Sequence, residues 1–384
     1  MRTLVRWVMT VSVAVLACVD ARIASAQGTR TGVFPSVTAG VVFDDNVFAQ
    51  PIPESDVLFR VSPAVTAMQV RPRRTITAAF GFDAERYERF ADLSTPTART
   101  VGSIIIDVKP SPKQTWGMSA GYLGTNNPME LNTLTSISTA RRHADRFEYA
   151  SRFQHDPSRI TTFEIMYSGN RDGFVDNVTY TNGVDLRFGR KLNPHSELFV
   201  RANSRIFNFG SLGGRTLTNQ LTSGWVWRGR SSTVNLAGGV SETLGQVAGT
   251  GAIAVTRTFG ALGLNGRFEK GTTSSVGIPG VVEFDRVELG VSRQSRLRMA
   301  NGQPRGLRFT VAVGAARNIM VIGETRNYLA TVEIFRPMTK TLTFVVAYNG
   351  TWQETVHGTS GLLGGDILRN RVAANIQFSP WSSR

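Results

Sequence analysis

Apolar and polar residues alternate along the segment 178–188. Its even positions are almost all apolar, and its odd positions are polar, charged or glycine. A period of two residues predicts a β-strand whose two faces meet different solvents. After a turn at 191–196 that contains Asn193-Pro194, the alternation resumes through 198–206. Each predicted strand has about a dozen residues, roughly twice the usual strand length in globular proteins. Such a hairpin is typical of a barrel wall with lipid outside and water inside.

The same hairpin pattern recurs along the chain. The alternation predicts roughly 18 antiparallel strands, at 33–43, 56–70, 75–87, 99–108, 115–124, 146–154, 160–169, 178–188, 198–206, 216–227, 233–244, 251–258, 261–270, 282–294, 307–317, 327–335, 342–352 and 369–378. The connections alternate strictly between short, Pro- and basic-rich segments and long segments rich in Gly, Ser or Asp. We therefore expect an all-β fold: a single closed antiparallel transmembrane β-barrel with short periplasmic turns and longer external loops. An open edge in hydrocarbon would leave backbone groups unpaired, so the sheet must close.

A soluble β-sandwich or propeller is the alternative fold. The predicted strands are too long for it, and no blade motif repeats. Tryptophan positions add support for a barrel, since Trp116, Trp225 and Trp227 lie beside short connections and Trp352 beside a long one. Those are the places where two interfacial aromatic girdles are expected.

The first residues set the compartment. Arg2 and Arg6 precede the apolar run 7–19, and Ala24-Ser25-Ala26 follows it. This order predicts a secretory signal peptide at 1–26 and a barrel at 27–384. Cys18, the only cysteine, lies in a V-L-A-C sequence that weakly resembles a lipoprotein cleavage site, so lipidation there is the alternative. Cleavage after Ala26 would leave a chain without disulfides.

The chain is strongly basic, with a formal net charge of +15. Residues 1–26 carry three arginines and one aspartate, a net of +2, which leaves +13 for the remainder. Basic chains often bind nucleic acid, but these arginines are scattered and follow an export signal, so we expect no nucleic acid partner. Outer-membrane lipid, lipopolysaccharide and anionic polymers fit the charge better. With the signal peptide, this places the protein in a Gram-negative-type outer membrane.

The polar strand faces supply the candidate functional residues. The predicted lumen carries Asp185, Arg187, Glu197, Arg201 and Arg205 on the hairpin 178–206, and Glu164, Arg286, Glu288 and Arg308 elsewhere. They form either a charged constriction that selects solutes by sign or an ordinary wet lining. A barrel of about 16–18 strands leaves an aqueous channel, whereas about eight strands fill with side chains. The long loops 126–145 and 354–366 are the candidates to fold inward and narrow it.

Two clusters of acidic residues have two interpretations each. Asp44-Asp45-Asn46, with Asp56 nearby, is either a Ca²⁺ site or a turn held by its own side chains. Asp172, Asp176 and Asn177 allow the same two interpretations, and the turn is favoured in both cases.

Catalysis has weak support in the sequence. His143 lies near Asp145 and His155 precedes Asp156, while His195 and His357 stand in other connections. A His–Asp pair can serve a hydrolase, but no G-x-S-x-G motif accompanies it. We expect solvated loop histidines, no enzyme activity, no metal and no cofactor.

The first two predicted strands resemble a known family. Residues 40–48 read G-V-V-F-D-D-N-V-F, and residues 56–63 read D-V-L-F-R-V-S-P. This is similar to the start of the outer-membrane β-barrel porins of the porin 2 type, which are encoded with exopolysaccharide gene clusters. Tyr87 and Phe90 fit the family's later aromatic position, whereas Phe43 stands where the family often has Tyr. The resemblance covers roughly the first 60 residues after the signal peptide.

The resemblance implies passage or export of an extracellular polysaccharide, and envelope export proteins as partners. Together with the pattern, it predicts an outer-membrane pore that carries such a polymer or small solutes by diffusion through a charged lumen. The alternative is a non-transporting barrel that acts in assembly or surface binding. The sequence names neither the solute nor the oligomeric state.

Overall fold

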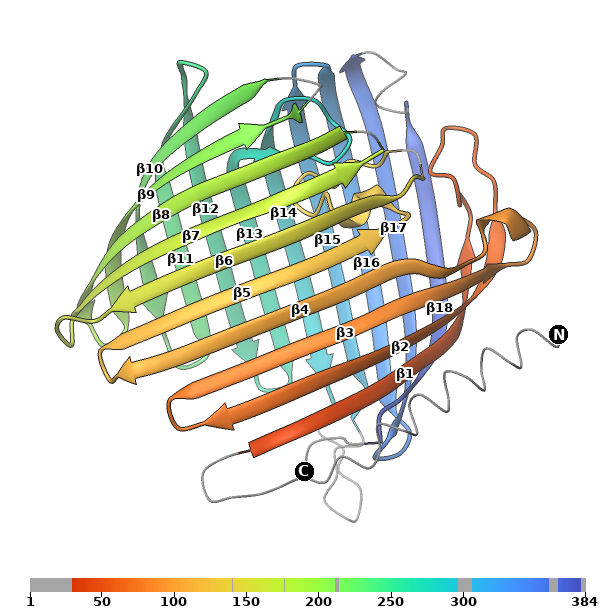
Figure 1. Ribbon diagram of the computed structural model, residues 1–384, viewed down its shortest axis with the longest axis horizontal. Coiled ribbons are helices and arrows are strands. Elements are labelled where there is room, and N and C mark those ends of the chain that lie inside the picture. Colours follow the sequence, from red (N-terminus) through yellow and green to blue (C-terminus); the bar gives the residue numbers. More distant parts are fainter. Residues whose placement is uncertain are drawn as a thin grey trace.

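The chain forms one closed barrel of 18 antiparallel strands (Figure 1). The computed structural model describes residues 30–139, 141–175, 177–210, 214–295, 306–358 and 365–380. The signal peptide predicted at 1–26, Cys18 included, lies outside these ranges. The strands are β1 (Arg30–Asp44), β2 (Asp56–Arg71), β3 (Arg74–Tyr87), β4 (Thr95–Ser111), β5 (Gln114–Thr125), β6 (Ala144–His155), β7 (Thr161–Phe174), β8 (Asn177–Asn193), β9 (Ser196–Asn208), β10 (Arg215–Arg228), β11 (Ser232–Thr243), β12 (Gln246–Phe259), β13 (Leu262–Ser274), β14 (Val281–Gln294), β15 (Arg308–Met320), β16 (Gly323–Pro337), β17 (Leu342–Gly358) and β18 (Ile367–Phe378). The predicted closed all-β barrel of about 18 strands is confirmed.

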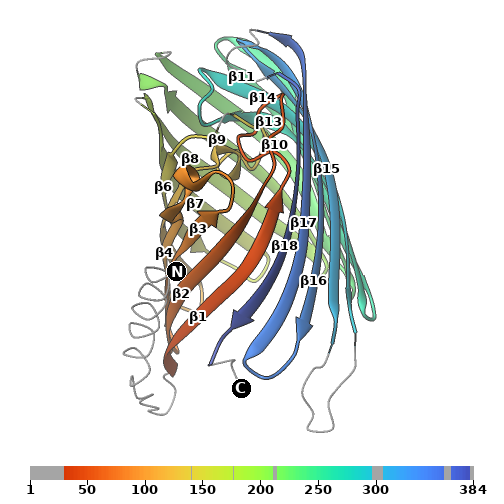
Figure 2. The same cartoon turned by 90° about the vertical axis from the view of Figure 1, so that its right-hand side faces the viewer.

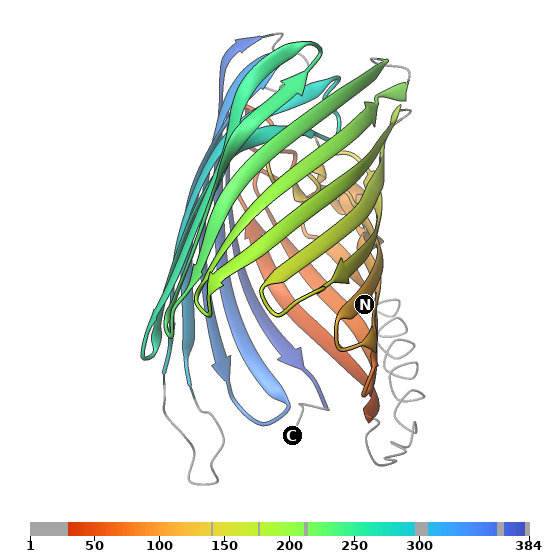
Figure 3. The same ribbon diagram turned by 90° about the vertical axis from the view of Figure 1, so that its left-hand side faces the viewer.

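Closure occurs between the first and last strands. β1 pairs with β18 from Val37 opposite Phe378 to Asp44 opposite Arg371. Every other strand pairs with its sequence neighbours, so the described wall has no free edge. Figures 2 and 3 show the strands inclined across this wall from two sides. Two 3-10 turns, η1 (Ala91–Leu93) and η2 (Pro128–Glu130), also occur. Among the described residues, no helix is long and apolar enough to cross a membrane.

The wall is apolar outside and polar inside. On the outer face, Phe188 is 50% exposed and Leu221 is 54% exposed. On the inner face of the same strands, Asp185 and Thr218 are buried. A soluble protein would place these sets the other way round, because apolar surface leaves water on folding. An outer apolar band around a polar interior is the arrangement of a transmembrane barrel.

Loop lengths follow the predicted trend but not its strict alternation. At the upper end of Figure 1, long connections follow β1, β3 and β5, yet 175–176, 244–245 and 321–322 have only two residues each. At the lower end, the connection 295–307 between β14 and β15 is long, and its residues 296–305 lie outside the described ranges. The strict alternation is therefore wrong at these four connections. The strands continue pairing beyond the regularly alternating segments, so the alternation does not mark their ends.

Two further sequence boundaries change for the same reason. Leu244 and Gly245 adopt φ of 55° and 77°, the geometry of a two-residue hairpin turn. The expected loop at 354–366 is shorter, because β17 continues to Gly358. Residues 359–364 of that connection lie outside the described ranges.

Candidate functional site

The longest described connection folds into the barrel instead of outward. This segment, residues 126–143 between β5 and β6, is here called the crossing loop; Ala140 lies outside the described residues. It lies inside the barrel outline in Figures 1 and 2. Its tip reaches β15, which stands nine strands from β6 in a ring of 18 (15 minus 6), directly opposite. The expectation that this loop folds inward agrees with its geometry.

Side-chain amides of the opposite wall hold the tip of the crossing loop. The carbonyl of Thr135 accepts hydrogen bonds of 2.9 Å from both Asn318 on β15 and Asn327 on β16. Gln353 on β17 accepts from the Ser138 amide at 2.8 Å and donates to the Ser138 carbonyl at 3.2 Å. Side chains of the wall thus satisfy the buried backbone groups of Thr135 and Ser138, which have no neighbouring strand to pair with.

Apolar contacts also hold the tip of the crossing loop against the wall. Ile137 of the crossing loop is fully buried against Ile278, Val282 and Met320. A hydrocarbon side chain without exposure inside a polar lumen shows that the tip is packed against the wall. Burial of this kind contributes about 1.5–3 kcal/mol per large side chain.

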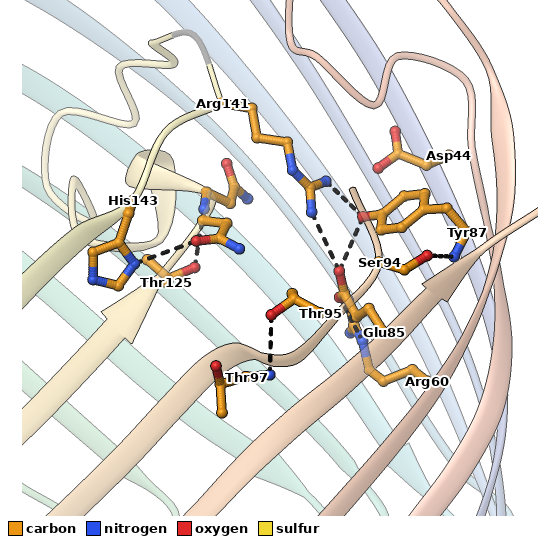
Figure 4. A network of polar contacts seen from close by, with 12 residues as sticks. Asp44, Arg60, Glu85, Tyr87, Ser94, Thr95, Thr97, Thr125, Arg141 and His143 are labelled. Carbon is orange, nitrogen blue, oxygen red and sulfur yellow. Dashed lines mark hydrogen bonds and ion pairs between the residues drawn. The ribbon is translucent and has the colours of Figure 1, made fainter. Parts of the chain in front are cut away.

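The returning limb of the crossing loop is held by an ionic cluster, drawn in Figure 4. Arg141 donates to the hydroxyl of Tyr87 at 2.5 Å and to Glu85 at 3.4 Å, and its guanidinium lies 4.9 Å from the Tyr87 ring centroid. Glu85 also accepts from Arg60 on β2 at 2.5 and 3.0 Å. His143, at the end of the limb, contacts Asn126 at 3.3 Å. The limb is therefore tied to β2 and β3.

The Asp44-Asp45-Asn46 sequence belongs to the barrel seam. Asp44 accepts from Arg369 at 2.6 and 3.0 Å and lies 3.2 Å from Arg371, all across the β1–β18 junction. Asp45 accepts twice from Asn370 at 2.6 Å. These carboxylates are engaged by protein donors, which removes the basis for the Ca²⁺ interpretation. The local contacts of the turn interpretation are present at Asn46, whose amide donates to Asp44 at 3.2 Å. Asp56 instead accepts from distant backbone amides in the β3–β4 connection, so it holds that connection and not a turn of its own.

Asp172, from the second acidic cluster, is also bonded to protein donors. Asp172 accepts from Arg146 at 2.6 and 2.9 Å and from Asn170 at 2.8 Å. Asp176 lies outside the described residues. In the described ranges, no three His, Cys, Asp or Glu side chains converge on a common point that would suit a metal ion.

Among the described residues, the side chains of His143, His155 and His195 make no contact with an Asp or Glu side chain. His143 contacts an asparagine, as described above, and His155 stacks on Phe153 with ring centroids 6.4 Å apart. His195 contacts the Arg228 carbonyl at 2.9 Å. The pairing of His155 with Asp156 suggested by their adjacency is absent from these contacts, because His155 lies on the outer face of β6 with Phe153.

The predicted lining residues of β8 and β9 lie together on the inner face. Arg187 stands directly opposite Arg201 in the register, an unfavourable like-charge pair unless each turns elsewhere. Each does: Arg201 contacts Asp185 at 2.6 Å, and Arg187 contacts Glu197 at 2.5 Å. Arg205 completes the group on the same face.

A further arginine joins this group from the next strand. Arg228 of β10 contacts Glu197 at 3.1 Å, and the sequence alone did not single it out. Arg187, Arg201, Arg205 and Arg228 against Asp185 and Glu197 leave a surplus of two positive charges. The β8–β10 wall therefore carries a positive potential.

The remaining predicted lining residues lie apart from this group. On β14, Arg286 contacts Glu288 at 3.1 Å and donates to the Thr133 carbonyl of the crossing loop. Arg308 begins β15 at the lower end, where its guanidinium lies 5.5 Å from the Phe335 ring. Glu164 faces inward opposite Arg187.

Glycines let charged side chains lie flat against the inner wall. A Cβ on Gly189 would come within 2.5 Å of Glu197, and one on Gly121 would come within 2.9 Å of Glu148. Each charged chain occupies the space above its neighbouring glycine. The charges thus line the wall without filling the lumen.

An open space of about 490 Å³ remains between the crossing loop and one side of the wall. This space, here called the eyelet cavity, is lined by inner-face residues of β4 to β9, by loop residues 131–135 and by Thr273 and Ser274 of β13. Its lining is mostly hydroxyls, small residues and a few charges. The crossing loop therefore occupies part of the lumen and leaves this space beside β4–β9.

The four predicted girdle tryptophans all point outward. Trp116 is 46% exposed and packs edge-on against Phe153, and Trp352 is 48% exposed and stacks on Tyr328. Trp225 and Trp227 lie on the outer face of β10 near its lower end. Their role at a lipid interface remains a prediction.

Comparisons with known proteins add similarity of architecture. No protein-family model matches the sequence, and no curated protein matches it significantly. Among solved structures, the chain is similar to OpdQ of Pseudomonas aeruginosa, at 10% identity and a TM-score of 0.47 over 91% of this chain and 98% of that one. It is also similar to OccAB4 of Acinetobacter baumannii, at 11% identity and a TM-score of 0.45 over 92% and 99%.

A siderophore receptor gives a comparable value. The siderophore receptor PirA from Pseudomonas aeruginosa matches at 9% identity and a TM-score of 0.42, over 90% of this chain and 80% of that one. At these identities and scores, the similarities carry no information about cargo.

Proposed function

We propose that the protein is an outer-membrane channel through which small hydrophilic solutes diffuse. The observation that carries the proposal is the eyelet cavity, an open polar space beside an inward-folded loop within an 18-stranded barrel. Barrels of about 16–18 strands are wide enough to hold water. A loop docked on the opposite wall reduces that width at one level, which sets a size limit on the solute. The β8–β10 surplus of positive charge favours anions.

The orientation follows from the outer surface. The upper end carries outward ion pairs, Lys270 with Asp285 and Arg317 with Glu324 at 2.9 Å, above the apolar band. We assign this end to the lipopolysaccharide leaflet, whose head groups are charged. The lower end, where the chain enters β1 and leaves β18, is then periplasmic.

Passage of an extracellular polysaccharide is the narrower form of the proposal. Its support is the resemblance in residues 40–63 to porins encoded with exopolysaccharide genes. A polymer would have to thread as a single chain through the space beside the crossing loop. Small solutes need not thread as a chain, so their diffusion is the broader form of the proposal.

Current through single molecules tests the proposal. Purified protein in planar bilayers should give steady, ion-carrying steps. In a chain without Cys18, Ser168→Cys in the eyelet cavity should lose most of its conductance when a charged thiosulfonate reagent is added. Ser292→Cys, on the inner face of β14 outside the cavity, is the control and should lose much less.

The alternative of a non-transporting barrel makes the opposite prediction. A well-folded, heat-modifiable barrel that carries no current would overturn the channel. Equal block at Ser168→Cys and Ser292→Cys would leave a channel whose narrowest point is elsewhere.

A further inference from the structure

Two opposite charges line the eyelet cavity without a partner. Glu148 of β6 and Arg205 of β9 both border the space, and neither side chain makes a hydrogen bond or ion pair within the described part of the chain. The third charged side chain of the lining, Arg146, is held by Asp172 and donates to the Leu131 carbonyl at 2.8 Å. The cavity thus presents one carboxylate and one guanidinium to its contents.

Arg205 remains unpaired because its nearest acids are engaged. Asp185 contacts Arg201 at 2.6 Å, and Glu269 is paired with Arg267. The chain of Arg205 crosses Gly183, where a Cβ would come within 2.8 Å of its Cγ. The aliphatic part of the Arg205 side chain therefore lies over β8, and the residue borders the cavity.

Glu148 lies at the other end of the same cavity. Its side chain crosses Gly121 of β5, where a Cβ would meet its Cγ at 3.0 Å. Between Gly121 and Gly183 lie three strand spacings, since β5 pairs with β6, β6 with β7 and β7 with β8. At about 4.8 Å per spacing, the two glycines are about 14 Å apart across the strands. The register puts Thr181 level with Gly121, so Gly183 lies two residues, about 7 Å, further along its strand, and the points where the two side chains cross the wall are about 16 Å apart.

The surface between the two charges is polar and suited to hydrogen bonding. The inner face there carries the side chains of Ser168, Asn170 and Thr181. Crossing-loop residues 131–135 also line the cavity. A ligand in this space meets donors and acceptors along its whole length.

We propose that the eyelet cavity binds a linear zwitterion of short-peptide length, with its ammonium at Glu148 and its carboxylate at Arg205. The inference rests on the proposed channel, because it names the solute class of the same space. Each charge-assisted contact takes about 2.8 Å, which leaves roughly 10 Å of the separation for the ligand's own charges. At about 3.3–3.6 Å per extended residue, that span corresponds to about three residues.

Binding is tested by titration calorimetry on detergent-solubilised, heat-modifiable protein, which does not depend on conductance. Triglycine is the probe, and N-acetyl-triglycine and triglycine amide each lack one terminal charge. Losing one charged contact is expected to weaken binding about tenfold or more. Glycine, which is too short to reach both charges, should bind as weakly as the blocked peptides.

Two variants assign the ends of the ligand. Glu148→Gln should remove the preference for triglycine over its N-acetyl form, and Arg205→Gln should remove the preference over its amide. The controls are Glu333→Gln and Arg152→Gln, which change inward charges outside the cavity and should keep both preferences.

Three results would overturn the site. They are equal binding of triglycine and both blocked peptides, equal binding of a neutral disaccharide, and loss of preference in the controls. Current without peptide binding would refute this site and leave the channel. Binding without current would refute the channel and leave the site.

Discussion

Removing Gln353 should loosen the crossing loop while leaving the barrel wall intact. The Gln353 side chain is 2% exposed, and its amide makes both hydrogen bonds to the backbone of Ser138, which is itself buried. The wall is held by backbone pairing along β16, β17 and β18, to which the side chain contributes nothing. Gln353→Ala therefore acts on the attachment of the loop.

The size of the effect follows from the two lost bonds. Each contributes about 0.5–1.5 kcal/mol, and a buried backbone group left unpaired costs about 1–3 kcal/mol. Lumen water satisfies part of this demand, so about 2–4 kcal/mol is a reasonable range for the weakened docking. Since 1.4 kcal/mol is a factor of ten, the undocked population should rise roughly 30- to 1000-fold.

Single-channel recording measures this change directly. Gln353→Ala should show frequent excursions to a higher conductance level, and peptides covering 131–139 should exchange amide hydrogens faster. Gln377→Ala, an inward-facing glutamine on β18 without a bond to the described part of the loop, is the control. Unchanged current noise and unchanged exchange in a folded Gln353→Ala barrel would refute the attachment described here.

Two further predictions concern charge. Replacing Arg187, Arg201 and Arg205 by Glu changes the β8–β10 surplus from +2 to −4 (Arg228 against five carboxylates), so anion preference should weaken or reverse; an unchanged reversal potential in a salt gradient would contradict this. Arg369→Met leaves Asp44 buried with one partner fewer and should destabilise the barrel by about 3–5 kcal/mol. The exposed Arg326→Gln should cost about 0–1 kcal/mol in the same urea-unfolding assay, and equal losses would count against a special role for the seam.

Alternation of residues determined the wall of this protein. The two-residue period reports the two faces of every strand, because each residue points either to the lipid side or to the lumen. The pattern therefore predicted the closed barrel, the strand number and the inward position of residues such as Arg187 and Arg201. It was weakest at strand ends, because strands such as β12 begin at Gln246, ahead of the segment 251–258 in which the residues alternate.

The constriction was decided only by tertiary structure. The length of 126–143 suggested an inward loop. The place where this loop binds the opposite wall depends on Asn318, Asn327 and Gln353, which lie far away in sequence. Inward amides also occur on other strands, such as Asn203 on β9 and Gln377 on β18, so the residue type alone did not mark these three.

The pairing of the charged side chains was also determined by the fold. The sequence listed arginines and carboxylates of the lumen together, whereas register and neighbouring glycines decide which of them pair. Asp44 resembled a cation ligand until closure of the barrel brought Arg369 beside it. A local pattern specifies which way a side chain points, and only the closed barrel specifies what it meets across the lumen.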